Sequence, residues 1–260
     1  YYKNLSERKI ESLNDLQNWL KDWSELDAVL GEYGRWAYVR TTIDTSDEKA
    51  KAALINLYTN IYPHVTVWAN LLDKKFIACE FTGELDEEVF FTTIRKIKNA
   101  LSLFREENIA LQSELQVKQS GYDQIIGAQS IQYKGAELTV QQAHVYLKNN
   151  DRAQREEIFK LINERKFQDA EKLDTLLTEL IQLRTKVAKN AGFENFMEFR
   201  FQELGRFDYT PADCLKFHDA IEEVLMPLVN RLFEERKKQL GVDVLKPWDR
   251  DVDPSGKAPL

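Results

Sequence analysis

The sequence NAGFENFMEFRFQELGRFDYTPAD, at residues 190–213, sets the boundaries of successive predicted helices. An apolar helical run before it should end at Asn190-Ala191-Gly192, because Gly192 can adopt the left-handed conformation that helix ends favour. Glu194-Asn195 then offers a polar start for a second helix, which Gly205 closes. The stretch therefore predicts two helices joined by a short linker.

A third helix is predicted to begin within the same stretch. Thr210 can cap the free backbone amides, and Pro211 already has the backbone angle of a first helical position. Asp213 favours the positive end of the helix dipole. We expect this helix to run to Leu240, with Gly241 as its stop.

Near the N-terminus, apolar residues repeat every three or four positions. Asn14 can cap this helix, which should end at Gly31, and a second, aromatic helix is expected from Tyr33 to Val39. Trp19 and Trp23 could stack on a ligand, but aromatic residues at helical spacing more often pack in a core. We therefore interpret this pair as core residues.

Two polar clusters mark the starts of further helices. The cluster at residues 44–47 precedes a long helical run from Ala50 to Leu72, in which Pro63 should remove one backbone hydrogen bond and bend the helix. The acidic cluster at residues 84–88 could suggest a cation site. It lacks the spacing of a calcium loop, however, and carboxylates suit the positive end of a helix.

Residues 131–138 change the apolar period from 3.6 to 2. They predict a β-hairpin with its turn at Lys134-Gly135, because Gly135 supplies the positive backbone angle of a tight turn. Thr139 and Gln142 have the spacing of a capping box, so the second strand should lead directly into a helix that ends near Leu147.

A helix capped by Asn149-Asn150-Asp151 is predicted to continue to Asn190, which is unusually long for a globular protein. A coiled coil is the alternative, although the apolar stripe lacks a sustained seven-residue repeat. Arg152 and Arg155 lie near the helix start, where a positive charge opposes the helix dipole. We interpret them as partners of a carboxylate in a buried ion pair, rather than as ligands of a substrate carboxylate.

The composition is that of a globular, helical protein. The chain has 260 residues, of which 43% are hydrophobic and 30% charged. Only 10 glycines and 6 prolines are present, which favours long helices. These signals predict a mainly α fold, a long-helix multi-helical array with one small β-hairpin near residues 129–139.

Charge and cysteine content limit the function classes. The net charge of -7 disfavours attraction to nucleic acid or to an anionic membrane. Neither a signal peptide nor an apolar run long enough to span a bilayer is evident. Cys79 and Cys214 lack metal or redox spacing, and we expect two buried thiols, which fits a cytoplasmic protein.

Three motifs resemble one known family. Residues 190–196 (NAGFENF), 206–213 (RFDYTPAD) and 245–249 (LKPWD) are similar, in order and spacing, to the middle of the oligoendopeptidase F branch of the thimet-oligopeptidase-like zinc metallopeptidases. The resemblance implies a thimet-oligopeptidase-like fold. Residues 1–128 would form an N-terminal helical lobe, and residues 129–260 would begin a catalytic domain that is incomplete at its C-terminus.

In that family, zinc is held by an H-E-x-x-H helix and a later glutamate, and a zinc-activated water attacks the peptide bond. The three histidines, His64, His144 and His218, lie far apart in the sequence, and none is followed by glutamate. We therefore assign no catalytic, metal-binding or substrate-binding residue. The resemblance implies zinc in the full-length enzyme, with ligands outside these 260 residues.

The resemblance thus implies the N-terminal part of a zinc metalloendopeptidase that hydrolyses short peptides inside a helical cleft. This segment alone is expected to be inactive. Its partners would be a peptide substrate and the missing C-terminal catalytic half, with no nucleic acid or membrane. The alternative is a non-catalytic, all-helical binding or scaffold module, and the residues encoded after Leu260 would discriminate between the two.

Overall fold

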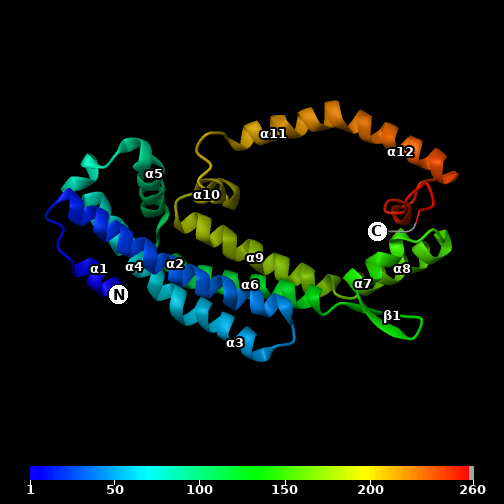
Figure 1. Ribbon diagram of the computed structural model, residues 1–260, viewed down its shortest axis with the longest axis horizontal. Coiled ribbons are helices and arrows are strands. Elements are labelled where there is room, and N and C mark those ends of the chain that lie inside the picture. Colours follow the sequence, from blue (N-terminus) through cyan, green and yellow to red (C-terminus); the bar gives the residue numbers. More distant parts are fainter. Residues whose placement is uncertain (258–260) are drawn as a thin grey trace. The chain divides into compact units, whose positions relative to one another are not determined.

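The structure is a computed structural model that describes residues 1–257 (Figure 1). Within these residues, helices are joined by short loops and a single antiparallel pair of strands. The predicted mainly α fold with one small hairpin is therefore confirmed. The chain forms two compact units: residues 1–123 with 176–208 make unit 1, and residues 124–175 with those from 209 onward make unit 2.

Unit 1 consists of helices and connecting loops, and its described residues include no strand. Its elements are α1 (Tyr2–Glu7), α2 (Leu13–Ile43), α3 (Glu48–Asn56), the π-helical η1 (Leu57–Ile61), α4 (Tyr62–Ala78), the 3-10 helix η2 (Glu80–Glu84), α5 (Glu87–Leu103), most of α6 (Glu107–Gly127), most of α9 (Ala170–Asn190) and α10 (Phe196–Glu203). Helix α4 packs against both α1 and α5.

Unit 2 contains the sheet and the last helices. Its elements are β1 (Ser130–Tyr133), β2 (Ala136–Thr139), α7 (Val140–His144), the 3-10 helix η3 (Val145–Lys148), α8 (Arg152–Phe167), α11 (Pro211–Ala220), the π-helical η4 (Ile221–Leu225), α12 (Met226–Leu240) and the 3-10 turn η5 (Pro247–Asp249), together with the remaining residues of α6 and α9.

Helix α2 is longer than the sequence predicts. It begins after the N-cap Ser12 rather than at Asn14. The predicted end at Gly31 and the separate helix from Tyr33 to Val39 are wrong, because one helix continues to Ile43. A glycine inside a helix is unfavourable by only about 1 kcal/mol relative to alanine, which tertiary packing can offset.

Close packing explains a glycine inside this helix. A Cβ added at Gly34 would lie 2.1 Å from the Tyr62 hydroxyl oxygen, so a larger residue could not be accommodated without movement. The glycine therefore lets α2 approach the start of α4, and it does not end the helix.

The interpretation of Trp19 and Trp23 as core residues is confirmed. Their exposed fractions are 0% and 9%, and they belong to a cluster with Leu72 and Phe76 of α4. The indole nitrogen of Trp19 donates a 2.8 Å hydrogen bond to the Leu5 carbonyl, which attaches α1 to this core. These aromatic rings thus hold the N-terminal helices together.

The helical runs that contain Pro63 and Pro227 are both irregular. The predicted disturbance at Pro63 takes the form of the π-helical segment η1, which ends two residues before the proline. A second π-helical segment, η4, ends two residues before Pro227, in a run where we predicted no interruption. A proline lacks the amide donor and its ring crowds the carbonyl four residues earlier, so the helix widens there.

The predicted single helix from Asp151 to Asn190 is wrong. It divides into α8 and α9 at Gln168-Asp169. The Asp169 side chain is buried and accepts hydrogen bonds from Gln129 Nε2 at 3.1 Å and Arg165 Nη1 at 2.6 Å. Since these partners satisfy a buried carboxylate, they favour a turn at this position.

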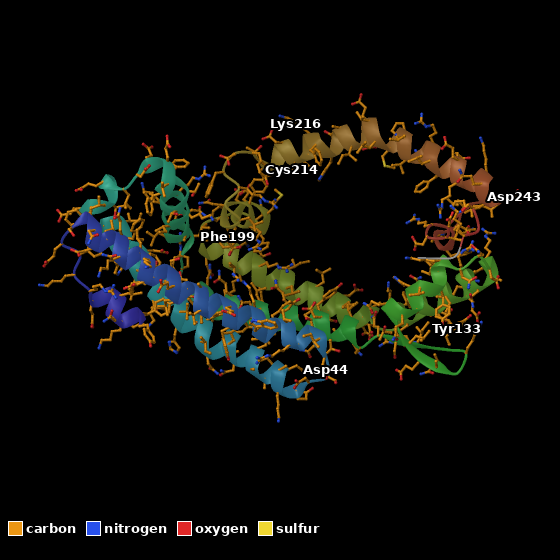
Figure 2. All side chains as sticks on the ribbon, in the orientation of Figure 1. Asp44, Tyr133, Phe199, Cys214, Lys216 and Asp243 are labelled. Carbon is orange, nitrogen blue, oxygen red and sulfur yellow. The ribbon has the colours of Figure 1, made fainter. Side chains whose placement is uncertain are left out.

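The hairpin is formed as predicted. Ile131 pairs with Leu138, and the turn residues Lys134 and Gly135 have φ angles of 50° and 81°. Tyr133, labelled in Figure 2, is buried on this hairpin. The capping box that begins α7 at Thr139 is also confirmed.

The helix ends predicted in residues 190–213 are confirmed. Gly192 has a φ of 89°, and the Phe193 amide donates to the Ala188 carbonyl, a bond typical of a helix C-terminus. Asn195 caps α10, and Thr210 caps α11 with a capping box. The assignment of residues 1–128 and 129–260 to two family domains stays a prediction.

Candidate functional site

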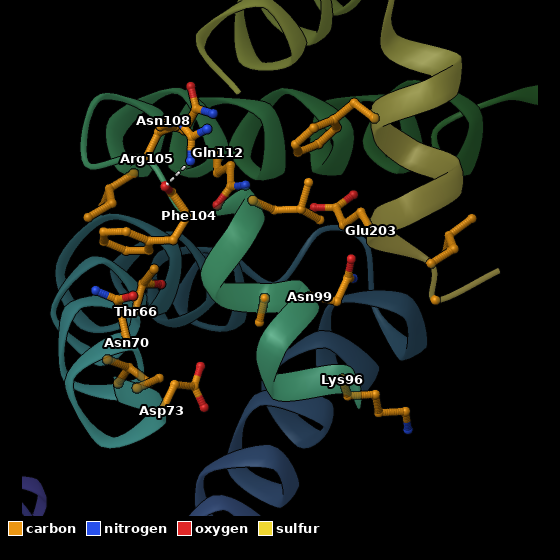
Figure 3. Close-up of a pocket in the computed structure, with 18 residues that line it drawn as sticks. Thr66, Asn70, Asp73, Lys96, Asn99, Phe104, Arg105, Asn108, Gln112 and Glu203 are labelled. Carbon is orange, nitrogen blue, oxygen red and sulfur yellow. Dashed lines mark hydrogen bonds between the residues drawn. The ribbon is translucent and has the colours of Figure 1, made fainter. Parts of the chain in front are cut away.

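Unit 1 contains a pocket of about 510 Å³ between α4, α5, α6 and α10 (Figure 3). Helix α4 contributes Thr66, Asn70 and Asp73, which lie about one turn apart on the same face. Phe104 and Phe199 contribute apolar wall. The pocket thus combines apolar surface with a short polar stripe.

Several polar side chains of this pocket are used by the fold. Asn99 Nδ2 donates to the Gln202 carbonyl at 2.9 Å, and Asn108 Nδ2 donates to the Val187 carbonyl at 3.0 Å. Arg105 Nε donates to the Asn190 carbonyl at 3.1 Å. These bonds join α5, α6 and the loop between them to the ends of α9 and α10. The donors that form them hold the pocket together and are not free for a ligand.

Two acceptors on α4 remain without a partner among the described residues. Asn70 is 7% exposed, and its Oδ1 atom has no hydrogen-bond partner among residues 1–257. The Asp73 carboxylate likewise has no hydrogen bond or ion pair with the described residues. Burial, and to a lesser extent the charge of Asp27, raise the pKa of Asp73 to about 6. Figure 3 shows Lys96, also in the lining, extending away from Asp73.

A different carboxylate, Asp249, lies at the centre of an ion-pair cluster in unit 2. Its side chain is fully buried. Arg155 Nη2 donates to Asp249 Oδ1 at 2.9 Å, and Arg152 donates to both carboxylate oxygens at 3.0 and 2.8 Å. The predicted buried ion pair is confirmed for Arg155, while Arg152 pairs with the same carboxylate from a partly exposed position.

The environment of Asp249 is complete without a ligand. Burial alone would raise its pKa, but hydrogen bonds from Arg152, the Lys246 amide and Arg155 outweigh burial and lower the pKa to about 2. Arg155 also donates to the Trp248 carbonyl at 2.9 Å. The LKPWD motif therefore anchors the segment after α12 to α8, which is a structural role.

Helices α11, η4 and α12 form a continuous run without a buried residue. Eight of their large apolar side chains are between 40% and 67% exposed: Leu215, Phe217, Val224, Leu225, Met226, Leu228, Leu232 and Phe233. Exposed apolar surface of this extent is typical of an interaction surface.

The described residues do not fit a zinc site. No group of three or more His, Cys, Asp or Glu side chains within residues 1–257 could hold a metal ion. The two cysteines are free, and the prediction that both are buried is wrong, because Cys79 and Cys214 are partly exposed. Among the described helices, none is both long and apolar enough to cross a membrane.

Solved structures share this fold. A protein described as oligoendopeptidase F from Bacillus anthracis matches 96% of this chain with a TM-score of 0.90 and 20% identity. A second oligoendopeptidase F structure matches 98% with a TM-score of 0.92 and 23% identity, and PZ peptidase A with an inhibitor matches 98% with a TM-score of 0.92 and 22% identity. The fold is therefore that of the oligoendopeptidase F structures.

This chain spans about half the length of those structures, since it covers 46%, 45% and 46% of their chains. Two family models match the sequence: the peptidase M3 N-terminal domain at residues 1–104, and peptidase family M3 at residues 145–254. No curated protein matches significantly. Two separate regions of the chain therefore match domains of peptidase family M3.

Sequence reasoning missed the pocket. Its signal was present: Thr66, Asn70 and Asp73 interrupt an otherwise apolar helical run at spacings of four and three. Polar residues that recur on one helix face within an apolar segment indicate a polar group directed toward the interior.

Proposed function

We propose that this chain is the N-terminal part of a zinc metalloendopeptidase that hydrolyses short peptides inside a helical cleft. The observation that carries the proposal is the order of the two family models, with the M3 N-terminal domain before the M3 peptidase domain. The fold shared with oligoendopeptidase F structures over 96–98% of this chain supports it.

This chain would form part of the helical wall of the cleft. A narrow cleft would exclude folded proteins by size. Because the described residues do not fit a zinc site, we propose that the zinc ligands lie in polypeptide outside these 260 residues. The exposed apolar side chains of α11 to α12 support this arrangement, because they offer a surface against which further polypeptide can pack. The two free cysteines support a cytoplasmic location.

The test is an assay of the complete gene product on an internally quenched oligopeptide. We expect cleavage that a chelator abolishes and added zinc restores. Residues 1–260 alone should bind no stoichiometric zinc and cleave nothing. A matched assay on a folded protein should show no cleavage, because the substrate must enter a narrow cleft.

Two results would contradict the proposal. One is cleavage that a chelator leaves unchanged. The other is a complete gene product that lacks an H-E-x-x-H sequence after residue 260. A stable, inactive monomer that ends at Leu260 would instead support the helical binding or scaffold module.

A further inference from the structure

We propose that the pocket between α4, α5, α6 and α10 binds the basic side chain of a peptide, with Asn70 and Asp73 as its acceptors. The choice of a peptide as the ligand rests on the proposed peptidase function. The choice of a basic side chain rests on the pocket itself.

The first observation is the pair of unpartnered acceptors. Asn70 Oδ1 is buried without a protein donor, and Asp73 follows it by three residues on the same helix. Side chains three residues apart on a helix have Cβ atoms about 5–6 Å apart, so one ligand group can reach both. A guanidinium group carries five N–H donors in a planar fork and offers donors to an amide oxygen and a carboxylate together.

The charges around Asp73 favour a cation as well. Asp27 on α2 is the nearby charge that raises the pKa of Asp73 further, so a positive ligand at Asp73 would reduce this repulsion. The other charged groups of the lining are Lys96 on α5, Arg105 in the loop between α5 and α6, and Glu203 on α10. Lys96 extends away from Asp73 (Figure 3), Arg105 is bonded to the Asn190 carbonyl, and Glu203 is paired with Arg200.

Size and apolar surface suit a long basic side chain. The volume of about 510 Å³ falls within the range of roughly 300–1,000 Å³ that is usual for small-molecule sites, and exceeds what one side chain needs. Leu103 and Phe104 offer apolar surface along which the methylene groups of an arginine or lysine can pack.

The test is calorimetric titration of the complete gene product with N-acetyl-arginine amide and with its neutral isostere, N-acetyl-citrulline amide. At pH 7.5 we expect arginine to bind about tenfold more tightly, since only its guanidinium group brings a positive charge to the Asp73 carboxylate. Asp73→Asn should remove this preference by weakening arginine far more than citrulline. Asn70→Leu, a change of similar size, should weaken both ligands about equally.

A matched control is Glu32→Gln, which removes one carboxylate from an exposed position on α2. We expect it to change neither affinity. Because the pKa of Asp73 is about 6, its ionised fraction rises about tenfold from pH 5 to pH 7, and arginine affinity should rise in parallel while citrulline affinity rises much less.

Equal affinities for the two ligands, or an Asp73→Asn variant that keeps the preference for arginine, would overturn this inference. Binding is detected as heat and not as cleavage, so its failure is distinguishable from failure of the proposed function. A protein that cleaves peptides without binding arginine selectively contradicts the pocket assignment alone. A protein that selects arginine but never cleaves contradicts only the peptidase proposal.

Discussion

Each of the two units removes an aspartate from water, but the surroundings of the two carboxylates differ. Asp249 in unit 2 is fully buried and accepts hydrogen bonds from Arg152, Arg155 and the Lys246 amide, which hold its pKa at about 2. Asp73 in unit 1 has no such donors, and burial raises its pKa to about 6. The fold supplies the donors in the first case and leaves them to a ligand in the second.

The contrast between the two carboxylates would be wrong if removing the Asp249 side chain left the free energy of unfolding unchanged. We expect Asp249→Ala to lower the free energy of unfolding by about 3–5 kcal/mol, because it leaves Arg155 as a buried charge without its partner. Urea denaturation of wild type and variant measures this change. Asp251→Ala, an exposed aspartate two residues later, is the matched control and should stay within about 0.5 kcal/mol of wild type.

Acid should remove the same contribution from the wild-type protein. The folded-state pKa of Asp249 lies below its ordinary value, so its contribution is present above about pH 4 and is lost as the pH falls toward 2. The stability difference between wild type and Asp249→Asn should therefore shrink across this window. A difference that stays constant from pH 5 to pH 2.5 would show that the carboxylate charge is not what stabilises the segment after α12.

Substitutions of the two arginines test whether burial decides how much each one contributes to stability. The Arg155 side chain is 3% exposed and the Arg152 side chain 44% exposed, although both pair with Asp249. We expect Arg155→Met to lower the free energy of unfolding by about 2–4 kcal/mol, and Arg152→Met by about 1 kcal/mol or less, because solvent screens the exposed pair. Equal losses in urea denaturation would mean that burial does not distinguish them.

Features that depend on neighbouring residues were predictable from the sequence. The cap at Asn195, the capping boxes at Thr139 and Thr210 and the Lys134-Gly135 turn each involve residues within a few positions of one another. Local backbone geometry decides such features, so a single sequence is sufficient to identify them.

Features that depend on distant partners were not predictable. The division between α8 and α9 involves Gln129, which is 40 positions from Asp169. The continuation of α2 involves Tyr62 beside Gly34. For the sites, the sequence suggested that Arg155 needs a carboxylate, but not that the carboxylate is Asp249, 94 positions later. Residue types indicated the need for a partner, and only the fold identified it.

An effect of similarly small size but opposite sign is expected at Asp73. Its pKa is raised in the folded state, so the folded chain holds the proton more tightly, and stability falls as the pH rises from about 4 to about 6. At pH 7.5, Asp73→Asn should therefore raise the free energy of unfolding by roughly 1 kcal/mol, a value reduced for solvent screening of this partly exposed side chain. At pH 4 the variant and wild type should have the same melting temperature.

Thermal unfolding at both pH values measures this difference. Saturating N-acetyl-arginine amide should stabilise wild type more than the variant at pH 7.5. A variant less stable than wild type at pH 7.5 would mean that Asp73, like Asp249, already has its partners within the fold.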